Sequence, residues 1–232
     1  MTRIDSYEDL TDNIVGWLKD YYWMHNVKAF VVGVSGGIDS AVVSSLCART
    51  GLPTYVVCMP LESKFENTKL SDAHSKALVE KYDNVKRIEV ELFSAYDSLI
   101  KSIEWWSEAQ HFDKKEFTSS DHANANTKSR MRMITLYQIA GTVGGIVVGT
   151  GNKVEDYGVG FYTKYGDGGV DIAPIADLYK TEVWELGEYL EVDQRIVDAD
   201  PTDGLWIDSR SDEEQLGASY AELEEAMETG TG

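Results

Sequence analysis

The segment "FVVGVSGGIDSAVVSSL" (residues 30–46) joins an apolar, β-branched run to a helical pattern through a glycine-rich turn. Residues 29–34 suit a buried parallel strand, and residues 40–48 continue as a helix. Small residues at such a junction let the backbone approach a ligand closely. The first N–H groups of the helix favour an anion such as a phosphate. The junction therefore predicts a nucleotide site.

Asp39 lies within the same turn, where its carboxylate would repel a bound phosphate unless a divalent cation lay between them. We therefore expect a nucleotide bound together with Mg²⁺. The turn lacks the lysine of the GxxxxGK[ST] loop, so an ordinary γ-phosphate transfer site is disfavoured. From these residues alone, a plain Gly-Gly turn capped by Ser40 or Asp39 remains the alternative.

Strand-like and helix-like segments alternate along the first 150 residues, which is typical of βαβ units on a parallel sheet. We expect an α/β fold: a doubly wound, mostly parallel, five-stranded sheet with helices on both faces, of the Rossmann-like type. A polar interval over 110–123 interrupts the alternation. The pattern predicts strands over 29–34, 53–61, 85–93 and 145–150, and helices over 4–24, 40–48, 68–82, 94–109 and 129–143.

The composition fits one α/β domain, and we expect residues 1–232 to form a single unit. The formal net charge of −19 argues against an extended nucleic-acid surface, which needs clustered Lys and Arg. The sequence shows neither a signal region nor an apolar span long enough for a bilayer, so we expect no membrane partner and a cytoplasmic location.

Cysteine and histidine supply little chemistry in this chain. The only two cysteines, Cys47 and Cys58, fall in apolar segments and fit core thiols better than a disulfide, zinc site or nucleophile. The histidines show no ligand spacing and are expected to be ordinary surface residues; they are His25, His74, His111 and His122.

The segment "GTGNKVEDYGVGFYTKYGDGGVDIAPIADLYK" (149–180) follows the last predicted strand and is dense in glycine, aromatic and acidic residues. Ligands of open α/β sheets bind at the carboxyl ends of strands, and a loop this long is usually functional. If strands 29–34 and 145–150 are neighbours, Glu155 would meet Asp39 across a metal ion.

Four blocks carry a resemblance to known families. "SGGIDS" (35–40) resembles the pyrophosphate-binding loop of the N-type ATP pyrophosphatases, which adenylate an oxygen and let a nitrogen or sulfur nucleophile displace AMP. "TKSRMRMITLYQIAG" (127–141), residues 149–180 and "DPTDGLWIDSRSDEEQLGASYAELE" (200–224) resemble, in the same order, blocks of NAD synthetases. The resemblance implies ATP-dependent amidation of deamido-NAD to NAD through an acyl-adenylate, with ammonia as donor and release of AMP and pyrophosphate.

The resemblance also implies an ATP site in which ATP is a co-substrate and Mg²⁺ a cofactor. Asp39 and Glu155 match its metal ligands. Lys180 would neutralise charge that builds on the phosphoryl oxygens, so these three are the expected catalytic residues. The implied ATP-binding residues are Gly33, Ser35, Gly36, Gly37, Ile38, Asp39, Ser40, Met59, Thr150, Lys180 and Thr202.

For the dinucleotide, the resemblance implies a second set of residues, on and just before the predicted helix 129–143 and in the segment 149–180. The flat ring of Phe161 suits a pyridine ring. Residues 208–212 match a loop that closes over the nucleotides. The implied deamido-NAD residues are Asn126, Arg130, Phe161, Lys164, Asp167 and Asp171. Surface cations at Arg130 and Lys180, and plain packing at Phe161, are the alternatives.

The family pairs two subunits, so we expect a homodimer in which the apolar faces of helices 4–24 and 130–143 supply the contact. Glutamine-dependent members carry an extra amidase domain with its own cysteine. We expect no glutaminase domain here, and therefore free ammonia as the donor. The stretch "MPLESKFENTKLSDAHSK" (59–76) matches the family poorly, so its nucleotide contacts, from Lys64 or Asn67, stay open.

Two other classes of function share the glycine loop. A tRNA-modifying pyrophosphatase would need a basic face and often reactive cysteines, and the net charge of −19 argues against it. A catalytically silent nucleotide-binding regulator would keep the loop without turnover. Magnesium-dependent release of pyrophosphate with deamido-NAD separates the three.

Overall fold

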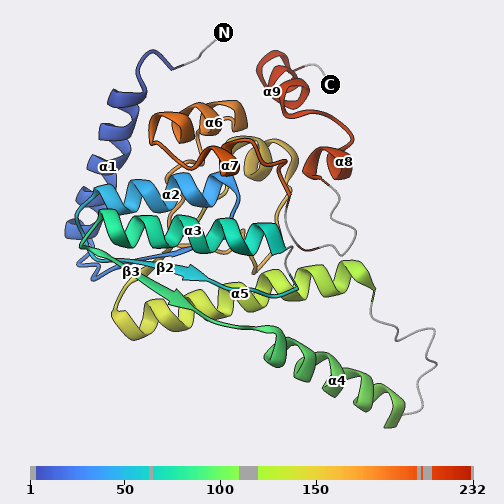
Figure 1. Ribbon diagram of the computed structural model, residues 1–232. Helices are drawn as coiled ribbons and strands as arrows, with labels where there is room; N and C mark the ends of the chain where they lie inside the picture. The colour runs from blue at the N-terminus through green and yellow to red at the C-terminus, as the bar shows by residue number, and fades with distance from the viewer. Residues whose placement is uncertain (1–3, 63–64, 110–119, 203–204, 206–210, 231–232) are drawn as a thin grey trace.

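A four-stranded parallel sheet forms the centre of the computed structural model, which describes residues 4–62, 65–109, 120–202, 205 and 211–230 (Figure 1). The strand order is β3-β2-β1-β4, and all three pairings are parallel. The predicted α/β class and parallel sheet are therefore confirmed. The strands are β1 Phe30–Gly33, β2 Thr54–Cys58, β3 Val85–Glu89 and β4 Ile146–Val148.

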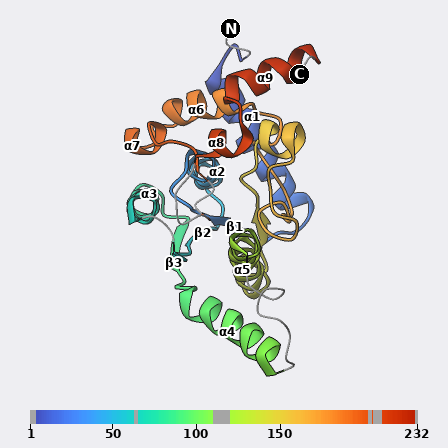
Figure 2. The same ribbon diagram turned by 90° about the vertical axis from the view of Figure 1, so that its right-hand side faces the viewer.

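Helices cover both faces of the sheet (Figures 1 and 2). On one face Phe30 and Val32 of β1 pack with side chains of α1, α2 and α6, whereas Val31 packs on the other face with Met133 and Leu136 of α5. This alternation is what a strand buried on both faces requires. The bounds are α1 Tyr7–Met24, α2 Ile38–Arg49, α3 Phe65–Lys81, α4 Phe93–Ala109, α5 Asp121–Val143, η1 Val154–Val159, α6 Lys180–Tyr189, α7 Gln194–Val197, α8 Asp212–Leu216 and α9 Tyr220–Thr229.

The prediction of five strands was wrong: the described residues contain four. Ile172 lies beside Val148 where a fifth strand would be, but it forms only an isolated parallel bridge. Gly149 N donates to Ile172 O at 2.7 Å. Asp171 N donates to Val147 O at 3.1 Å, and no more extended ladder forms between these described segments, so the contact remains a single bridge.

The predicted start of the helix 129–143 was wrong, because α5 already begins at Asp121, inside the polar interval 110–123, of which residues 110–119 lie outside the described residues. Ser120 caps the helix, and its Oγ accepts from Ala123 N at 3.2 Å. Asp121 and His122 are exposed in the first turn, so apolar periodicity was no guide to the start of this helix.

The prediction of a surface histidine was wrong for His74. Its ring is 6% exposed and lies against α2, with Nε2 2.9 Å from Ser44 Oγ, and burial lowers its pKa to about 4. His25 and His122 are exposed as predicted, and His111 lies outside the described residues. The buried contact between Ser44 and His74 therefore joins α2 to α3.

The two cysteines are buried, in agreement with the prediction of core thiols, and burial raises the pKa of Cys47. Within the part of the chain that the structure describes, no helix has the length and apolar content that a bilayer crossing demands.

The order in which strands are added to the sheet reverses at β1: β2 and β3 lie on one side of it and β4 on the other. The loops after β1 and β4 therefore leave the sheet in opposite directions at neighbouring carboxyl ends. In open α/β sheets such a switch point is where ligands bind. The prediction that strands 29–34 and 145–150 are neighbours is confirmed, because β1 pairs with β4 and Phe30 lies opposite Ile146.

Candidate active site

Hydrogen bonds of its two serines fix the conformation of the turn between β1 and α2. Ser40 Oγ donates to Gly37 O at 2.9 Å and accepts from Ser35 N at 3.1 Å, and Ser35 Oγ accepts from Gly37 N at 3.2 Å. The N-cap of α2 is Gly37, with no side-chain cap bond among the described residues. The alternative of a turn capped by Ser40 or Asp39 is therefore not what the structure shows.

Gly36 is the position in this turn that requires glycine. Its φ is +97°, and a Cβ there would lie 2.4 Å from Asn67 O at the start of α3. A side chain would both strain the backbone and force α3 away from the turn. The glycine-rich sequence thus lets the first turn of α3 pack directly against the loop.

Asp39, Glu155 and Lys180 meet at the switch point. Asp39 lies in the first turn of α2, Glu155 in η1 after β4, and Lys180 is the first residue of α6. Lys180 Nζ lies 2.7 Å from Asp39 Oδ2 and 2.9 Å from Glu155 Oε1. The lysine side chain is only 3% exposed. Two carboxylates from separate loops thus converge on one positive charge.

Burial and mutual contact set the protonation of this group. Burial opposes the charge on Lys180, but the two carboxylates outweigh it and raise its pKa. Burial raises the pKa of Asp39. For Glu155 the opposing effect of burial is outweighed by Lys180 and by hydrogen bonds, so its pKa is lowered. The next residue, Asp156, lines the same cavity, and burial and the carboxylates around it raise its pKa to about 6. The site therefore concentrates negative charge and favours a bound cation.

Two residues that the sequence interpretation missed support these carboxylates. Asn152 is fully buried; its Nδ2 donates to Asp39 Oδ1 at 3.0 Å, and its Oδ1 accepts from the backbone of Val154 and Glu155. Tyr220 OH donates to Glu155 Oε1 at 2.7 Å. For both, the available signal was that they lie within the family-like blocks 149–180 and 200–224.

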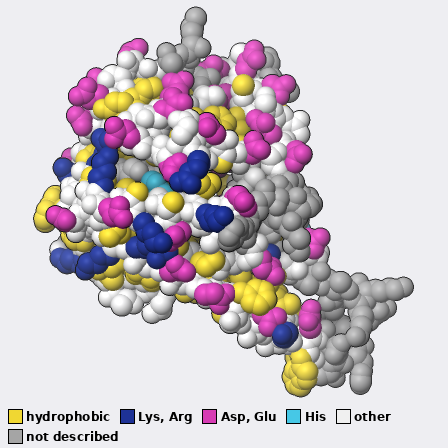
Figure 3. Space-filling model, in the orientation of Figure 1, with side chains coloured by type: hydrophobic (Ala, Val, Ile, Leu, Met, Phe, Trp, Pro, Cys, Tyr) yellow, Lys and Arg dark blue, Asp and Glu magenta, His cyan; other side chains and the backbone are white. Residues whose placement is uncertain are grey.

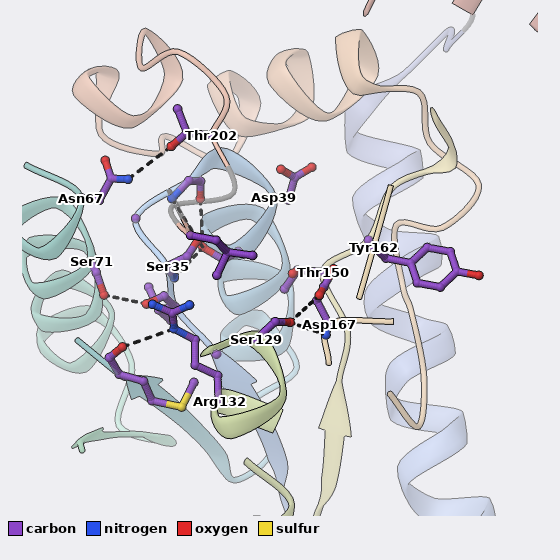
Figure 4. A pocket seen from close by; sticks show the side chains of 18 of the residues that line it. Ser35, Asp39, Asn67, Ser71, Ser129, Arg132, Thr150, Tyr162, Asp167 and Thr202 are labelled. Atoms are coloured by element: carbon purple, nitrogen blue, oxygen red, sulfur yellow. Dashed lines mark hydrogen bonds between the residues drawn. The ribbon is translucent and has the colours of Figure 1, made fainter. Parts of the chain in front are cut away.

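A cavity of about 780 Å³ extends from the glycine turn past the carboxylates to α5 (Figure 4). This volume is in the range of small-molecule sites. Of the predicted residues, those that line it are Gly33, Ser35, Gly36, Gly37, Ile38, Asp39, Ser40, Met59, Asn126, Thr150, Glu155, Phe161, Asp167, Lys180 and Thr202.

Three of the predicted dinucleotide residues, Arg130, Lys164 and Asp171, do not line this cavity and have exposed side chains. Arg130 Nε donates to Lys164 O at 3.0 Å. The carboxylate of Asp171 accepts from Val147 N at 2.8 Å and from Tyr137 OH at 3.1 Å. The structure therefore shows these residues joining the 161–171 segment to α5 and β4.

The loop that follows Phe161 is fastened to α5 by side-chain hydrogen bonds. Asp167 Oδ1 accepts from Ser129 Oγ at 2.6 Å and from Thr163 N at 3.1 Å (Figure 4). Asn126 Oδ1 accepts from Thr163 Oγ1 at 2.8 Å. Phe161 itself is half-buried at the cavity wall.

The first turn of α3, where the sequence departs from the family, also lines the cavity. Asn67 Nδ2 donates to Thr202 Oγ1 at 3.4 Å, so this turn meets the segment that precedes α8 (Figure 4). Lys64 lies outside the described residues. Of the predicted closing loop 208–212, residues 208–210 are also outside them, while Asp212 is buried and lines the cavity.

The donor set fits a magnesium ion bound together with a polyphosphate. The described residues contain no group of three or more His, Cys, Asp or Glu placed to hold a metal. Mg²⁺ in nucleotide sites commonly takes one or two carboxylates and completes its shell with phosphate oxygens and water. Asp39 and Glu155, which already share one cation in Lys180, match that pattern.

Comparison with known proteins identifies the family. The family model described as NAD synthase matches residues 10–231. The chain belongs to the NAD synthase family. An NH(3)-dependent NAD(+) synthetase from Carboxydothermus hydrogenoformans is 36% identical over 228 residues, covering 98% of this chain and 88% of that protein.

Solved structures agree with this membership. The structure of an NMN synthetase from Francisella tularensis matches with a TM-score of 0.85 and 32% identity, over 97% of this chain and 87% of that one. An NH3-dependent NAD synthetase from Campylobacter jejuni matches with a TM-score of 0.74 and 26% identity, over 97% and 85% of the two chains. The resemblance to NAD synthetases is confirmed, whereas the roles of single site residues stay predictions.

Proposed function

We propose that this member of the NAD synthase family is an ammonia-dependent NAD synthetase, which amidates deamido-NAD with ATP and releases AMP and pyrophosphate. The observation that carries the proposal is the convergence of Asp39 and Glu155 on Lys180 beside the glycine turn. Its support is a glycine-rich turn at the start of a helix and a buried charge cluster, which line the same cavity. Two of the relatives named above are NH3-dependent NAD synthetases, which also supports the proposal.

Activation by ATP solves a specific chemical problem. The carboxylate of nicotinate is a poor electrophile, because direct amidation would expel oxide. Attack of this carboxylate on the α-phosphorus of ATP expels pyrophosphate and gives an acyl-adenylate. Ammonia then attacks the acyl carbon and AMP leaves, so no protein nucleophile is needed. We assign Mg²⁺ to Asp39 and Glu155, where it would neutralise the charge of the leaving pyrophosphate.

The protein's own groups act by position and charge. We assign the phosphates of ATP to the start of α2, where the glycine-rich turn meets the positive end of the helix dipole. Lys180 is placed to stabilise negative charge on the phosphoryl oxygens, as a fixed positive charge in a buried site does best. The nicotinate end is assigned to the cavity wall at Phe161, while Arg130, Lys164 and Asp171 lie on the adjoining surface and stay predictions.

The substrate itself has a second candidate, nicotinate mononucleotide, which carries the same carboxylate without the second nucleotide. It is favoured by the TM-score of 0.85 to a structure titled NMN synthetase. The decisive experiment supplies the purified protein with ATP, Mg²⁺, ammonium and either substrate, and follows pyrophosphate and the amidated product. We expect a kcat/KM higher for deamido-NAD. A higher value for the mononucleotide would reassign the substrate, and release of pyrophosphate with neither would reject the proposed reaction.

We predict that ammonium, rather than glutamine, supports turnover by this chain. Both cysteines are buried, and burial raises the pKa of Cys47, so neither is suited to attack a glutamine amide. Neutral ammonia has the lone pair that attacks the acyl carbon, so the rate at fixed total ammonium should rise with pH. The measurement is NAD formation with ammonium or with ammonia-free glutamine. Brisk turnover with glutamine would contradict it.

We propose a homodimer, for which exposed apolar side chains on three helices are the support. They are Trp17, Trp23 and Met24 on α1, Leu99, Ile103, Trp105 and Trp106 on α4, and Ile134 and Tyr137 on α5. α4 projects away from the body of the subunit (Figures 1 and 2). An obligate two-fold interface would bury roughly 2,000 Å² or more. Light scattering should give twice the chain mass, and a monomer at micromolar concentration would contradict it.

The two other classes of function receive less support. On the face shown in Figure 3, Asp and Glu side chains lie among the Lys and Arg side chains, so its described residues form no continuous basic surface for nucleic acid. The buried cluster of Lys180 with Asp39 and Glu155 is typical of a catalytic site, so it favours an enzyme over a silent nucleotide-binding regulator. The expected cytoplasmic location stays a prediction.

A further inference from the structure

The hydroxyl of Tyr220 reaches the charge cluster from the C-terminal helix. Tyr220 begins α9 and is 1% exposed. Its OH lies 2.7 Å from Glu155 Oε1 and 3.4 Å from Asp212 Oδ2. Because a phenol has a single hydrogen, the shorter contact identifies Glu155 as the acceptor.

The ring of Tyr220 is held against α6. It meets Trp184 edge-on, with 5.8 Å between ring centroids, and Lys180 Nζ lies 5.0 Å from its centroid. One turn later on α9, the buried carboxylate of Glu224 accepts from Thr181 N at 3.0 Å and from Thr181 Oγ1 at 2.7 Å. α9 is therefore fastened to the first turn of α6, beside the lysine of the cluster.

We propose that Tyr220 is a positioning residue whose hydroxyl orients Glu155 to bind the divalent cation that accompanies ATP. This inference rests on the metal role assigned to Glu155 above. Lys180 also donates to Glu155 Oε1. A divalent cation bound by Glu155 would compete with the Lys180 ammonium for this carboxylate. Phosphate oxygens of ATP would also attract the ammonium away from Glu155. Tyr220 is a neutral donor from another element, so it holds Glu155 without competing for the carboxylate charge. Loss of such outer contacts typically weakens metal binding about 10- to 100-fold.

The test is Tyr220→Phe, which removes one oxygen and keeps the ring against Trp184. The probe is Mn²⁺, measured by electron paramagnetic resonance in the presence of α,β-methylene-ATP. In this analogue a methylene group replaces the oxygen between the α- and β-phosphorus atoms, so pyrophosphate cannot be released. We expect Mn²⁺ binding to weaken about tenfold. The Mg²⁺ concentration for half-maximal turnover should rise by a similar factor, while the KM for ammonium stays unchanged.

Tyr22→Phe is the matched control, because Tyr22 is also a buried tyrosine with one hydrogen bond, from its OH to Lys28 O at 3.2 Å, but lies on α1. All measurements are made well below the unfolding temperature of either variant. Unchanged Mn²⁺ affinity in Tyr220→Phe, or an equal loss in Tyr22→Phe, would overturn the inference. If the wild type failed to bind Mn²⁺ with the analogue, or Glu155→Gln bound it normally, the metal assignment would fall instead.

Discussion

Replacing either carboxylate of the cluster should nearly abolish NAD synthesis while the protein stays folded. In Asp39→Asn and Glu155→Gln the side chain keeps its size, but one of the two charges that face the proposed Mg²⁺ is lost. Stabilisation of the leaving pyrophosphate depends on that ion, so we expect turnover to fall on the order of a hundredfold or more. Steady-state release of pyrophosphate over a series of Mg²⁺ concentrations is the measurement.

The control for this pair is Glu191→Gln, whose side chain is 79% exposed and pairs across the surface with Lys81 at 3.3 Å. Surface pairs of this kind contribute little, so activity should be unchanged. Near-normal activity in Asp39→Asn or in Glu155→Gln, with the circular dichroism spectrum of the wild type, would reject the assignment of that residue as a metal ligand.

Lys180→Met should lose both activity and stability, and Mg²⁺ should restore part of the stability. The variant removes the charge proposed to stabilise the phosphoryl oxygens, so turnover should fall on the order of a hundredfold. It also leaves Asp39 and Glu155 buried without their counter-charge; breaking such a buried pair costs about 3–5 kcal/mol of unfolding free energy. A divalent cation can take the place of the ammonium between the two carboxylates.

Thermal unfolding with EDTA and with Mg²⁺ distinguishes replacement of the Lys180 ammonium by a cation from a general loss of packing. We expect the unfolding temperature of Lys180→Met to rise with Mg²⁺ by more than that of the wild type. Lys81→Met, which removes an exposed lysine from a surface pair, should behave as the wild type in both solutions. An unfolding temperature of Lys180→Met that ignores Mg²⁺ would contradict a cation site at these carboxylates.

Features set by local sequence were predictable. The β1–α2 junction follows from a β-branched run, a glycine turn and a helical pattern within seventeen residues, 30–46. The meeting of Asp39 and Glu155 follows from one additional step, the neighbourhood of β1 and β4, because carboxyl ends of adjacent parallel strands share an edge.

Features that depend on distant contacts were not predictable in this way. Asn152 and Tyr220 reach the two carboxylates through hydrogen bonds between different elements, and no periodicity marks such contacts. His74 is buried and contacts Ser44 of α2. The polar sequence around His74 contains no sign of this contact with another helix. The predicted fifth strand is reduced to one bridge, between Ile172 and Val148, and the number of residues that pair in this way is not encoded in the local pattern.

The ammonium of Lys180 gives this protein an internal counter-ion. Proteins whose ligands are assembled by a metal alone unfold when a chelator removes it. Here the carboxylates of Asp39 and Glu155 are already neutralised in part from within the chain. With the role proposed for Mg²⁺, a fall in free magnesium would slow NAD synthesis reversibly, while the amount of folded protein, and its exposure to proteases, would stay the same.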